Sequence, residues 1–302
     1  MSADLRWLAI LDTPLRHPGE QAPSGFEFQS VALWNLPSSA VALRLTNVGF
    51  GYDVDLSPDG SLVAISGDGA QIVSTQGSGT RALSDSQIIW EHPPPPDVPT
   101  VGSWVGNLTF SPDGTLLASG RSDAVDLLRA DNGASVDELV AKVSSPGVAF
   151  SPDGQYLASS APSLWRVADR AVVWAPQVSD PSCASGCLTD NWATFSPDGT
   201  LLLTQSAKLF PSNDDPSWDT LTNLFDAASG APLRSLSGDL PRRPTFSADG
   251  RWIVAGDRLI DVKTGHESAL GVSAAISLFL SDGRIAVADA SGAVSLLCPL
   301  PP

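Results

Sequence analysis

The chain has 302 residues, of which 42% are apolar, and it carries a formal net charge of −16 at pH 7. This length and apolar content allow a full hydrophobic core, whereas no stretch approaches the roughly eighteen consecutive apolar residues that a transmembrane helix needs. The acidic charge comes from Asp more than from Glu. This charge argues against nucleic acid as a partner and against binding to anionic membranes, although Asp is also what tight turns require. The lack of a long apolar stretch argues against membrane insertion.

A five-residue phrase, Phe-Ser-Pro-Asp-Gly, recurs along the chain and divides it into repeats. In this phrase Pro presets φ, Asp bonds the backbone two residues on, and Gly supplies a positive φ, which together make a tight turn. Apolar runs flank the turns on both sides, as expected of β-hairpins. The turns, of which the first is degenerate and the last is one residue short, lie at residues 2–5, 57–60, 111–114, 151–154, 196–199, 247–250 and 281–283.

Each repeat continues with a third strand that ends in a bulky apolar pair, such as Leu224-Phe225. A second turn of the form Asp-x-x-x-Gly often follows, as at 226–230, and a fourth strand closes the unit, as at 232–236. Four antiparallel strands per repeat is the pattern of a propeller blade. We therefore predict an all-β chain in which residues 1–302 form a single domain, a seven-bladed β-propeller of four-stranded antiparallel blades with incomplete first and last blades.

Blade 1 begins with the degenerate turn and a second strand within residues 2–10, followed by strands at 30–36 and 40–45. Blade 2 takes strands at 52–56, 62–66 and 71–74, and its fourth strand lies at either 81–83 or 88–90. Blades 3 to 7 are expected at residues 106–140, 147–174, 192–236, 244–270 and 274–298.

The repeats resemble those of bacterial WD40-repeat proteins over nearly the whole chain, and propellers of the TolB type share the same turn. The matching features are the Phe-Ser-Pro-Asp-Gly turns with their Leu-Ala-Ser second strands and the Asp-x-x-x-Gly turns, best seen at 224–230. The chain departs from the family because the Trp-Asp dipeptide is never complete at the end of a third strand and the Gly-His pair before the first strand is missing. These departures imply blades that rely on apolar packing instead of a buried Ser-His-Asp network.

The two end blades each lack one strand, because blade 1 has no first strand and blade 7 has no fourth. In WD40-like rings one N-terminal segment commonly supplies both strands. An open ring would leave unpaired strand edges. We therefore expect the native protein to begin upstream of Met1, where an effector domain could also lie. The alternative is a ring closed by apolar packing of three-stranded blades.

Four long connections interrupt the regular spacing of the turns. They fall at residues 11–27, 84–103, 175–191 and 206–220. Connections between blades and connections from second to third strand emerge at the same end of a blade, so all four are expected on one face. Functional residues commonly lie on such loops, although surface loops also tolerate neutral insertion.

Cys183 and Cys187 lie close together in the third long connection. A disulfide between them would indicate an oxidising compartment, whereas two free thiols remain the alternative. A zinc site would need two further ligands, and none of the three His residues is near, so no metal is expected. No signal peptide is visible in this chain, and the compartment stays open, cytoplasmic or extracytoplasmic.

Nine tryptophans are present, and four of them lie in or beside the long connections: Trp90, Trp104, Trp192 and Trp218. Exposed aromatic side chains anchor binding sites, so these four are the binding candidates, with loop packing as the alternative. The other five are expected in the core or between blades: Trp7, Trp34, Trp165, Trp174 and Trp252.

No nucleophile elbow, phosphate-binding loop or metalloprotease motif is present in the sequence. The pattern favours a non-enzymatic, monomeric scaffold that binds a protein or peptide through a loop-rich face, with no cofactor and no catalytic residue. The alternative is a propeller enzyme of the hydrolase or lactonase type, with metal or carboxylates at the mouth of the central channel. Converging carboxylates or histidines at that mouth would favour the enzyme, and exposed aromatics on the loop face would favour the scaffold.

Overall fold

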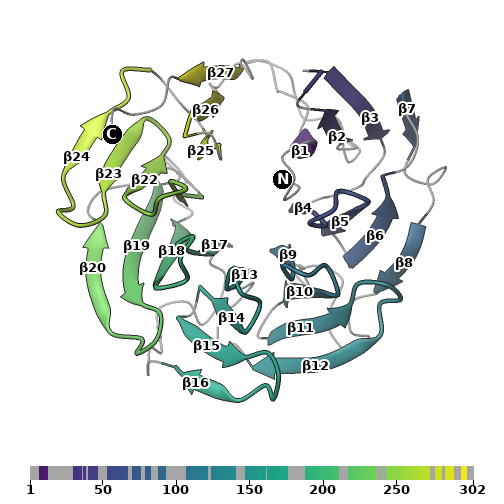
Figure 1. The fold of residues 1–302 in the computed structure, drawn as a ribbon, viewed down its shortest axis with the longest axis horizontal. Helices are drawn as coiled ribbons and strands as arrows, with labels where there is room; N and C mark the ends of the chain where they lie inside the picture. The colour runs from purple at the N-terminus through teal and green to yellow at the C-terminus, as the bar shows by residue number, and fades with distance from the viewer. Residues whose placement is uncertain are drawn as a thin grey trace. The chain divides into compact units, whose positions relative to one another are not determined.

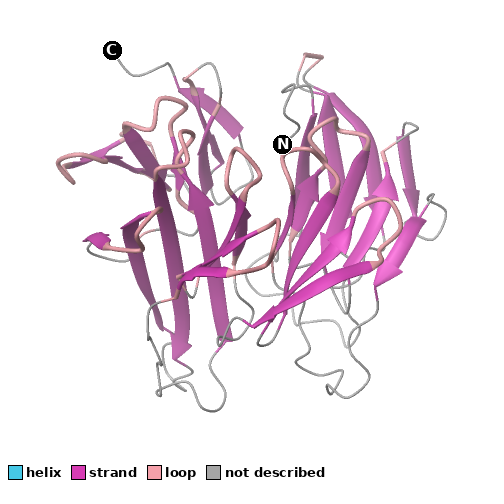
Figure 2. Ribbon diagram, turned by 60° about the horizontal axis from the view of Figure 1, so that its bottom comes forward, coloured by secondary structure: helices cyan, strands magenta, loops and turns pink. Residues whose placement is uncertain are grey.

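The computed structural model describes residues 7–12, 30–35, 37–38, 40–46, 53–66, 70–75, 79–82, 88–92, 107–121, 124–140, 147–160, 162–175, 188–210, 217–236, 240, 243–272, 276–280, 283–288 and 294–297. In these residues the chain consists of strands and loops, as Figure 2 shows. The chain divides into two compact units, Met1–Val148 and Ala149–Pro302.

Unit 1 contains three four-stranded sheets, one for each of blades 1 to 3 (Figure 1). Their strand orders are β1-β2-β3-β7, β4-β5-β6-β8 and β9-β10-β11-β12. The strands are β1 (Trp7–Asp12), β2 (Ser30–Asn35), β3 (Ala40–Thr46), β4 (Val54–Leu56), β5 (Leu62–Ser66), β6 (Ala70–Ser74), β7 (Gly79–Ala82), β8 (Ile88–His92), β9 (Leu108–Phe110), β10 (Leu116–Arg121), β11 (Ala124–Arg129) and β12 (Ser135–Val140).

Both segments proposed for the fourth strand of blade 2 are strands, but they belong to different sheets. β8 pairs antiparallel with β6 and is the fourth strand of blade 2. β7 pairs parallel with β3, so the chain between β6 and β8 adds an outer strand to blade 1. The sequence predicts that blade 1 lacks a first strand, and in the described residues β1 pairs only with β2.

Unit 2 contains the sheets of blades 4 to 7, with strand orders β13 to β16, β17 to β20, β21 to β24 and β25 to β27. Blade 7 therefore has three strands in the described residues, as the sequence predicts. The strands are β13 (Val148–Phe150), β14 (Tyr156–Ser159), β15 (Ser163–Arg166), β16 (Val172–Trp174), β17 (Leu188–Phe195), β18 (Leu201–Phe210), β19 (Ser217–Asp226), β20 (Pro232–Leu236), β21 (Thr245–Phe246), β22 (Trp252–Ala255), β23 (Arg258–Asp261), β24 (Glu267–Ala269), β25 (Ile276–Phe279), β26 (Ile285–Ala288) and β27 (Val294–Leu297).

Blade 5 differs from the sequence prediction because its strands are longer. The connection expected over 206–220 is largely strand: β18 and β19 stay paired from Leu201↔Asp226 out to Phe210↔Ser217, which leaves only 211–216 between them. The prediction of a long loop there was wrong. The first strand also starts earlier than expected, at Leu188.

The Phe-Ser-Pro-Asp-Gly turns form as the sequence predicts, and each is stabilised by its own side chains. In blade 5, Gly199 N donates to Ser196 O at 2.8 Å, and Ser196 Oγ accepts from Leu201 N at 2.9 Å. The Ser196 hydroxyl donates to Asp198 Oδ1 at 2.6 Å, and Thr200 N donates to the same oxygen at 3.0 Å. These hydrogen bonds, the one from Ser196 first, lower the pKa of Asp198. The same arrangement lowers the pKa of Asp59, Asp113, Asp153 and Asp249.

The core lies between neighbouring blades, where apolar side chains of adjacent sheets meet. In unit 1, Ile72 of blade 2 packs in one cluster with Leu117 and Leu128 of blade 3. In unit 2, Leu164 of blade 4 packs with Leu202 and Phe225 of blade 5. Burial of such side chains stabilises the fold by about 1.5–3 kcal/mol each.

Hydrogen bonds as well as apolar packing join blades 2 and 3. Two carboxylates on β4 or beside it accept hydrogen bonds from the backbone of β9: Asp53 Oδ2 from Leu108 N at 3.0 Å and Asp55 Oδ2 from Phe110 N at 2.9 Å. They satisfy N–H groups on the edge of blade 3, which would otherwise be costly to bury. Burial raises the pKa of Asp55, and the neighbouring Asp53 acts in the same direction. The expectation of blades held by apolar packing alone is therefore incomplete.

Blades 2 and 3 are also joined at the turn after the third strand of blade 3, where a tryptophan of blade 2 covers a glycine. We call this contact the turn lock. Trp90 on β8 lies over Gly133 of blade 3, so closely that a Cβ on this glycine would be 2.7 Å from the indole ring. The indole Nε1 donates to Ala130 O at 2.8 Å. Gly133 has a φ of 70°, which only glycine adopts readily.

The same lock recurs twice in unit 2. Trp174 on β16 covers Gly230 of blade 5, at 2.5 Å from a Cβ built there, and donates from Nε1 to Ala227 O at 2.8 Å. Between blades 5 and 6 an arginine replaces the tryptophan: Arg234 covers Gly265 and donates from Nη1 to Thr264 O at 2.6 Å. One side chain thus covers one turn of the next blade at each of these three junctions.

Candidate functional site

The candidate site lies in blade 5, at the end of the sheet opposite the Phe-Ser-Pro-Asp-Gly turn. Three strands extend there beyond the fourth: residues 188–191 of β17, 206–210 of β18 and 217–221 of β19, together called the blade 5 projection. The second and third strands of the other blades have only four to six residues. At about 3.4 Å per residue, four or five extra residues reach about 15 Å further.

The outer edge of the projection carries exposed apolar surface. β20 ends at Leu236, which pairs with Thr222, and no strand in the described residues pairs with 217–221 on that side. Leu221 is 56% exposed. Trp218, one of the four predicted binding residues, lies on the same stretch, where it pairs with Leu209. The structure therefore places Trp218 in a strand and not in a loop.

Trp192, the second predicted binding residue in this region, stands at the base of the projection on β17. Its half-buried indole donates from Nε1 to Pro244 O at 3.3 Å, in the segment between blades 5 and 6. The guanidinium of Arg243 lies over the indole, with Cζ 5.1 Å from the ring centroid. This cation–π contact contributes about 0.5–2 kcal/mol, depending on its desolvation.

A buried glutamine holds the segment that carries Arg243. Gln205, which is 2% exposed, accepts from Arg243 N at 3.0 Å through Oε1. Its Nε2 donates to Thr222 Oγ1 at 3.2 Å and to Leu240 O at 3.3 Å. The amide of Gln205 thus links two strands of blade 5 to the chain that leads into blade 6.

The backbone at Arg243 is strained. Its φ is 62°, in the left-handed region that costs a non-glycine residue about 1–2 kcal/mol, and it precedes Pro244, where an extended conformation is usual. Arg170 is the other described non-glycine residue with a positive φ, at 59°. Arg170 takes the place that glycine has in the turns after other third strands, since its N donates to Arg166 O as Gly230 N does to Asp226 O. Arg243 has no such repeat position to explain it.

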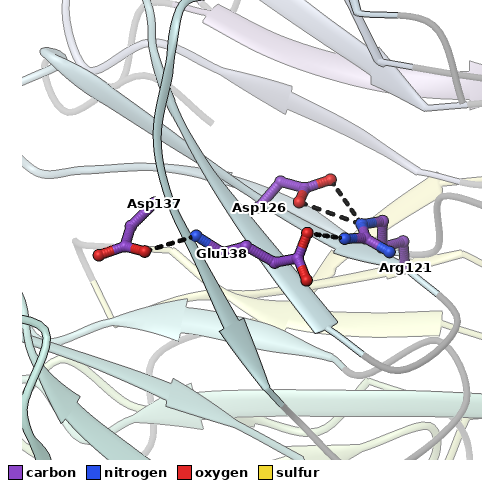
Figure 3. A network of polar contacts seen from close by, with 4 residues as sticks. All are labelled: Arg121, Asp126, Asp137 and Glu138. Carbon is purple, nitrogen blue, oxygen red and sulfur yellow. Dashed lines mark hydrogen bonds and ion pairs between the residues drawn. The ribbon is translucent and has the colours of Figure 1, made fainter. Parts of the chain in front are cut away.

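A second arginine cluster lies at the corresponding end of blade 3, and Figure 3 shows it. Asp126 and Glu138 stand opposite each other on β11 and β12, an arrangement of like charges that destabilises a sheet. Arg121 bonds both: its Nε lies 3.0 and 2.9 Å from the two oxygens of Asp126, and its Nη2 contacts Glu138 Oε2. These ion pairs join β10, β11 and β12 within one sheet.

Of the other predicted site residues, the structure describes Trp90 alone. Trp90 is 8% exposed and covers Gly133, so its ring packs between blades, although the sequence placed it beside a long connection. Trp104, Cys183 and Cys187 lie outside the described residues, so the binding role of Trp104 and the disulfide stay predictions.

Among the residues that the structure describes, no group of three or more His, Cys, Asp or Glu side chains could hold a metal ion. No described helix is long and apolar enough to cross a membrane.

Sequence reasoning missed Arg243 and Gln205. Gln205 sits on a strand like many exposed polar residues, and its burial depends on contact with Leu240, thirty-five positions away. A weak signal did exist, since Pro241-Arg242-Arg243-Pro244 concentrates positive charge in an acidic chain.

Comparison with known proteins agrees with this architecture. The model of the WD domain, G-beta repeat, matches residues 99–125, which include β9 and β10 of blade 3. No protein with a curated description matches the sequence. Among solved structures, a chain of the mitotic checkpoint complex is similar, with a TM-score of 0.62 and 16% identity over 89% of this chain and 84% of that chain. The periplasmic gluconolactonase of Pseudomonas aeruginosa is also similar, with a TM-score of 0.58 and 17% identity over 98% of this chain and 82% of that chain.

These two structures stand among 573 chains that match, so the fold is widely shared and does not by itself select a function. Seven sheets follow seven sequence turns, one repeat matches a WD repeat model, and the whole architecture matches propeller proteins. The chain therefore has the fold of a seven-bladed β-propeller, in which residues 99–125 are similar to a WD repeat.

Proposed function

We propose that the chain is a protein-interaction scaffold that binds a protein or peptide partner at the loop-bearing end of blade 5. The observation that carries this proposal is the blade 5 projection, in which β19 continues past the end of β20 and exposes Leu221, where no strand in the described residues lies on its outer side. Strand edges with exposed apolar side chains are used for partner binding, or are otherwise protected by charge, proline or a covering segment. Trp192 stands at the base of the projection and Trp218 on its outer strand, and tryptophan is a residue type that interfaces favour.

The length of β18 and β19, ten residues each, distinguishes blade 5 from the other described blades. The likeness to a chain of the mitotic checkpoint complex, a protein assembly, accords with a scaffold role. A rigid sheet also positions binding residues more firmly than a loop does.

The test compares two leucines of nearly equal exposure on the same blade. Leu221 is 56% exposed on the projection, and Leu233 is 53% exposed on β20, away from it. Tagged wild-type chain, Leu221→Asp and Trp218→Ala are used to recover partners from a lysate of the source organism, with Leu233→Asp as the matched control. Each recovered protein is then purified and its Kd measured directly.

We expect Leu221→Asp and Trp218→Ala to weaken binding at least tenfold, as for central interface residues, while Leu233→Asp binds like wild type. Equal binding by all four proteins would overturn the proposal. Circular dichroism and unfolding midpoints establish that each variant is folded.

A second candidate is a hydrolase, because the similar gluconolactonase acts within the same fold. Turnover of glucono-δ-lactone by the purified chain, with and without added divalent metal, tests it. Hydrolysis above the spontaneous rate that is abolished by substitutions in a defined site would favour this candidate over the scaffold.

A further inference from the structure

We propose that Asn132 is a site of covalent modification, where the backbone nitrogen of Gly133 displaces ammonia from the side chain, and that the turn lock controls the rate of this deamidation. Asn132 is exposed in the turn between β11 and β12. Because glycine has no Cβ, the nitrogen of an Asn-Gly bond is the least hindered backbone nucleophile that an asparagine can have. Asn-Gly occurs once in the sequence, at this turn.

The turn does not need an asparagine at this position. Asn132 Oδ1 accepts a hydrogen bond from Ala134 N at 2.9 Å. In the corresponding turns of unit 2, Ser229 Oγ accepts the same bond from the residue two positions on at 3.3 Å, and Thr264 Oγ1 accepts it at 3.2 Å. A hydroxyl therefore also closes this turn, which makes Asn132→Ser a conservative variant without a carboxamide.

The hydrogen bond from Ala134 favours the reaction. Gly133 N, once it has lost its proton to hydroxide, attacks Cγ of Asn132 and negative charge develops on Oδ1. The N–H of Ala134 already lies at hydrogen-bond distance from that oxygen and stabilises the charge. The bond from Cγ to Nδ2 then breaks, its nitrogen takes a proton from water and leaves as ammonia, and a cyclic succinimide remains. Water opens this ring at either carbonyl carbon, which gives aspartate or isoaspartate at position 132.

The folded turn holds the nucleophile back from this attack. Gly133 N donates to Arg129 O at 2.9 Å, so it can reach Cγ of Asn132 only after that hydrogen bond opens. The ring of Trp90 lies over Gly133, and its Nε1 donates to Ala130 O, so opening of the turn also has to displace the indole. The reaction therefore proceeds through a local opening, at a rate proportional to the fraction of open molecules.

The modification acts on the junction between blades 2 and 3. Isoaspartate adds a methylene to the backbone directly before Gly133, where the ring of Trp90 leaves no room even for a Cβ. Both products also place a negative charge next to Asp131, which is paired with Arg129. We expect isoaspartate to release the turn lock and to lower the unfolding midpoint of the chain.

The test follows position 132 by peptide mass spectrometry while the purified full-length chain is incubated at mildly alkaline pH. Trp90→Phe keeps a ring without the hydrogen bond, and Trp90→Ala removes both. Trp174→Ala is the matched control, because it removes the equivalent lock over Gly230, which follows a serine instead of an asparagine. A synthetic peptide of residues 129–135 gives the rate without the fold.

We expect wild type to deamidate about tenfold or more slowly than the peptide, since the reaction requires local opening. Trp90→Ala should approach the rate of the peptide and Trp90→Phe should fall between, whereas Trp174→Ala should react like wild type. The rates should rise with pH, because the backbone nitrogen has to lose its proton. After prolonged incubation the unfolding midpoint of wild type should fall, while that of Asn132→Ser should stay unchanged.

Three results would overturn the inference. Equal rates in wild type and the peptide would mean that the turn gives no protection. Equal rates in wild type and Trp90→Ala would mean that the turn lock does not control the reaction. Equal acceleration by Trp90→Ala and Trp174→Ala would assign the rate to the stability of the whole chain. If Trp90→Ala does not fold, Trp90→Phe and Trp174→Phe make the same comparison, with a smaller expected difference.

Discussion

Blade 5 has two kinds of turn, and both hold a glycine in the same backbone conformation for different reasons. Gly199, in the turn between the first two strands, has a φ of 72° and meets Pro152 of the preceding blade at an ordinary 3.5 Å from a built Cβ. Gly230, in the turn between the last two strands, has a φ of 70° but lies under the ring of Trp174 at 2.5 Å. The first glycine is needed for conformation alone, whereas the second is needed for conformation and for space. Conformation and neighbouring contacts are therefore separable requirements, and substitutions can test each.

The largest effect is expected for Gly230→Ala. A positive φ costs alanine about 1 kcal/mol, and displacing the Trp174 ring adds about 1–3 kcal/mol of overpacking. We expect the free energy of unfolding to fall by about 2–4 kcal/mol, measured by urea denaturation. A loss no larger than that of Gly199→Ala would show that the Trp174 ring moves away freely and that the lock contributes little.

Trp174→Phe tests the same lock from the other side. The smaller ring leaves Gly230 its space but loses the 2.8 Å hydrogen bond from Nε1 to Ala227 O. An unpaired buried carbonyl costs about 1–3 kcal/mol, so the free energy of unfolding should fall by about 1–2 kcal/mol. Trp90→Phe removes the equivalent bond to Ala130 O in unit 1 and should cost the same. If the two variants lose unequal amounts of unfolding free energy, the Trp90 and Trp174 hydrogen bonds do not contribute equally to stability.

Gly199→Ala and Gly271→Ala measure the free-energy cost of a positive φ by itself, without a close side-chain contact. Gly271 has a φ of 75° and nothing within 4 Å of a built Cβ, which makes it the reference for strain without contact. Both substitutions should lower the free energy of unfolding by about 1 kcal/mol. If Gly199→Ala costs clearly more than Gly271→Ala, the contact with Pro152 is tighter than its 3.5 Å separation indicates.

The smallest effect concerns pH. Hydrogen bonds from Ser196 and Thr200 lower the folded-state pKa of Asp198 below its unfolded value. Its stabilising contribution is therefore present above the unfolded pKa, near 4, and is lost as pH falls through the lower folded value. Asp198→Asn should reduce the drop in unfolding free energy between pH 7 and pH 3, and adding Asp249→Asn should reduce it further. An unchanged pH dependence in the double variant would contradict this assignment.

The architecture could be predicted because it depends on local chemistry. A turn such as 196–199 is specified by adjacent residues, and seven copies define seven sheets. The packing role of Trp174 also followed from its place in a fourth strand. The sequence did not assign Trp90 to the packing between blades, because two short strands follow β6 and either could be the fourth strand of blade 2. The sequence does not show that β7 pairs with β3 of blade 1 instead.

The candidate site was only partly predictable. Trp192 and Trp218 stood out as aromatic residues near long connections, but the projection did not. Residues 217–221, Ser-Trp-Asp-Thr-Leu, show no regular alternation of apolar and polar residues, and they border a segment rich in Asn, Asp and Pro at 211–216. The orientation of Arg243 depends on Gln205, and no local pattern encodes a contact over such a distance.

The parallel pairing of β7 with β3 has a consequence for synthesis of the chain on the ribosome. Blade 1 cannot receive its outermost strand until the third strand of blade 2 has been made, because β7 follows β6 in the chain. At about 5–20 residues per second, the edge of β3 stays open for a few seconds after it emerges. During that interval the outer edge of β3 lacks β7 and can pair with strands of other nascent chains on the same polysome.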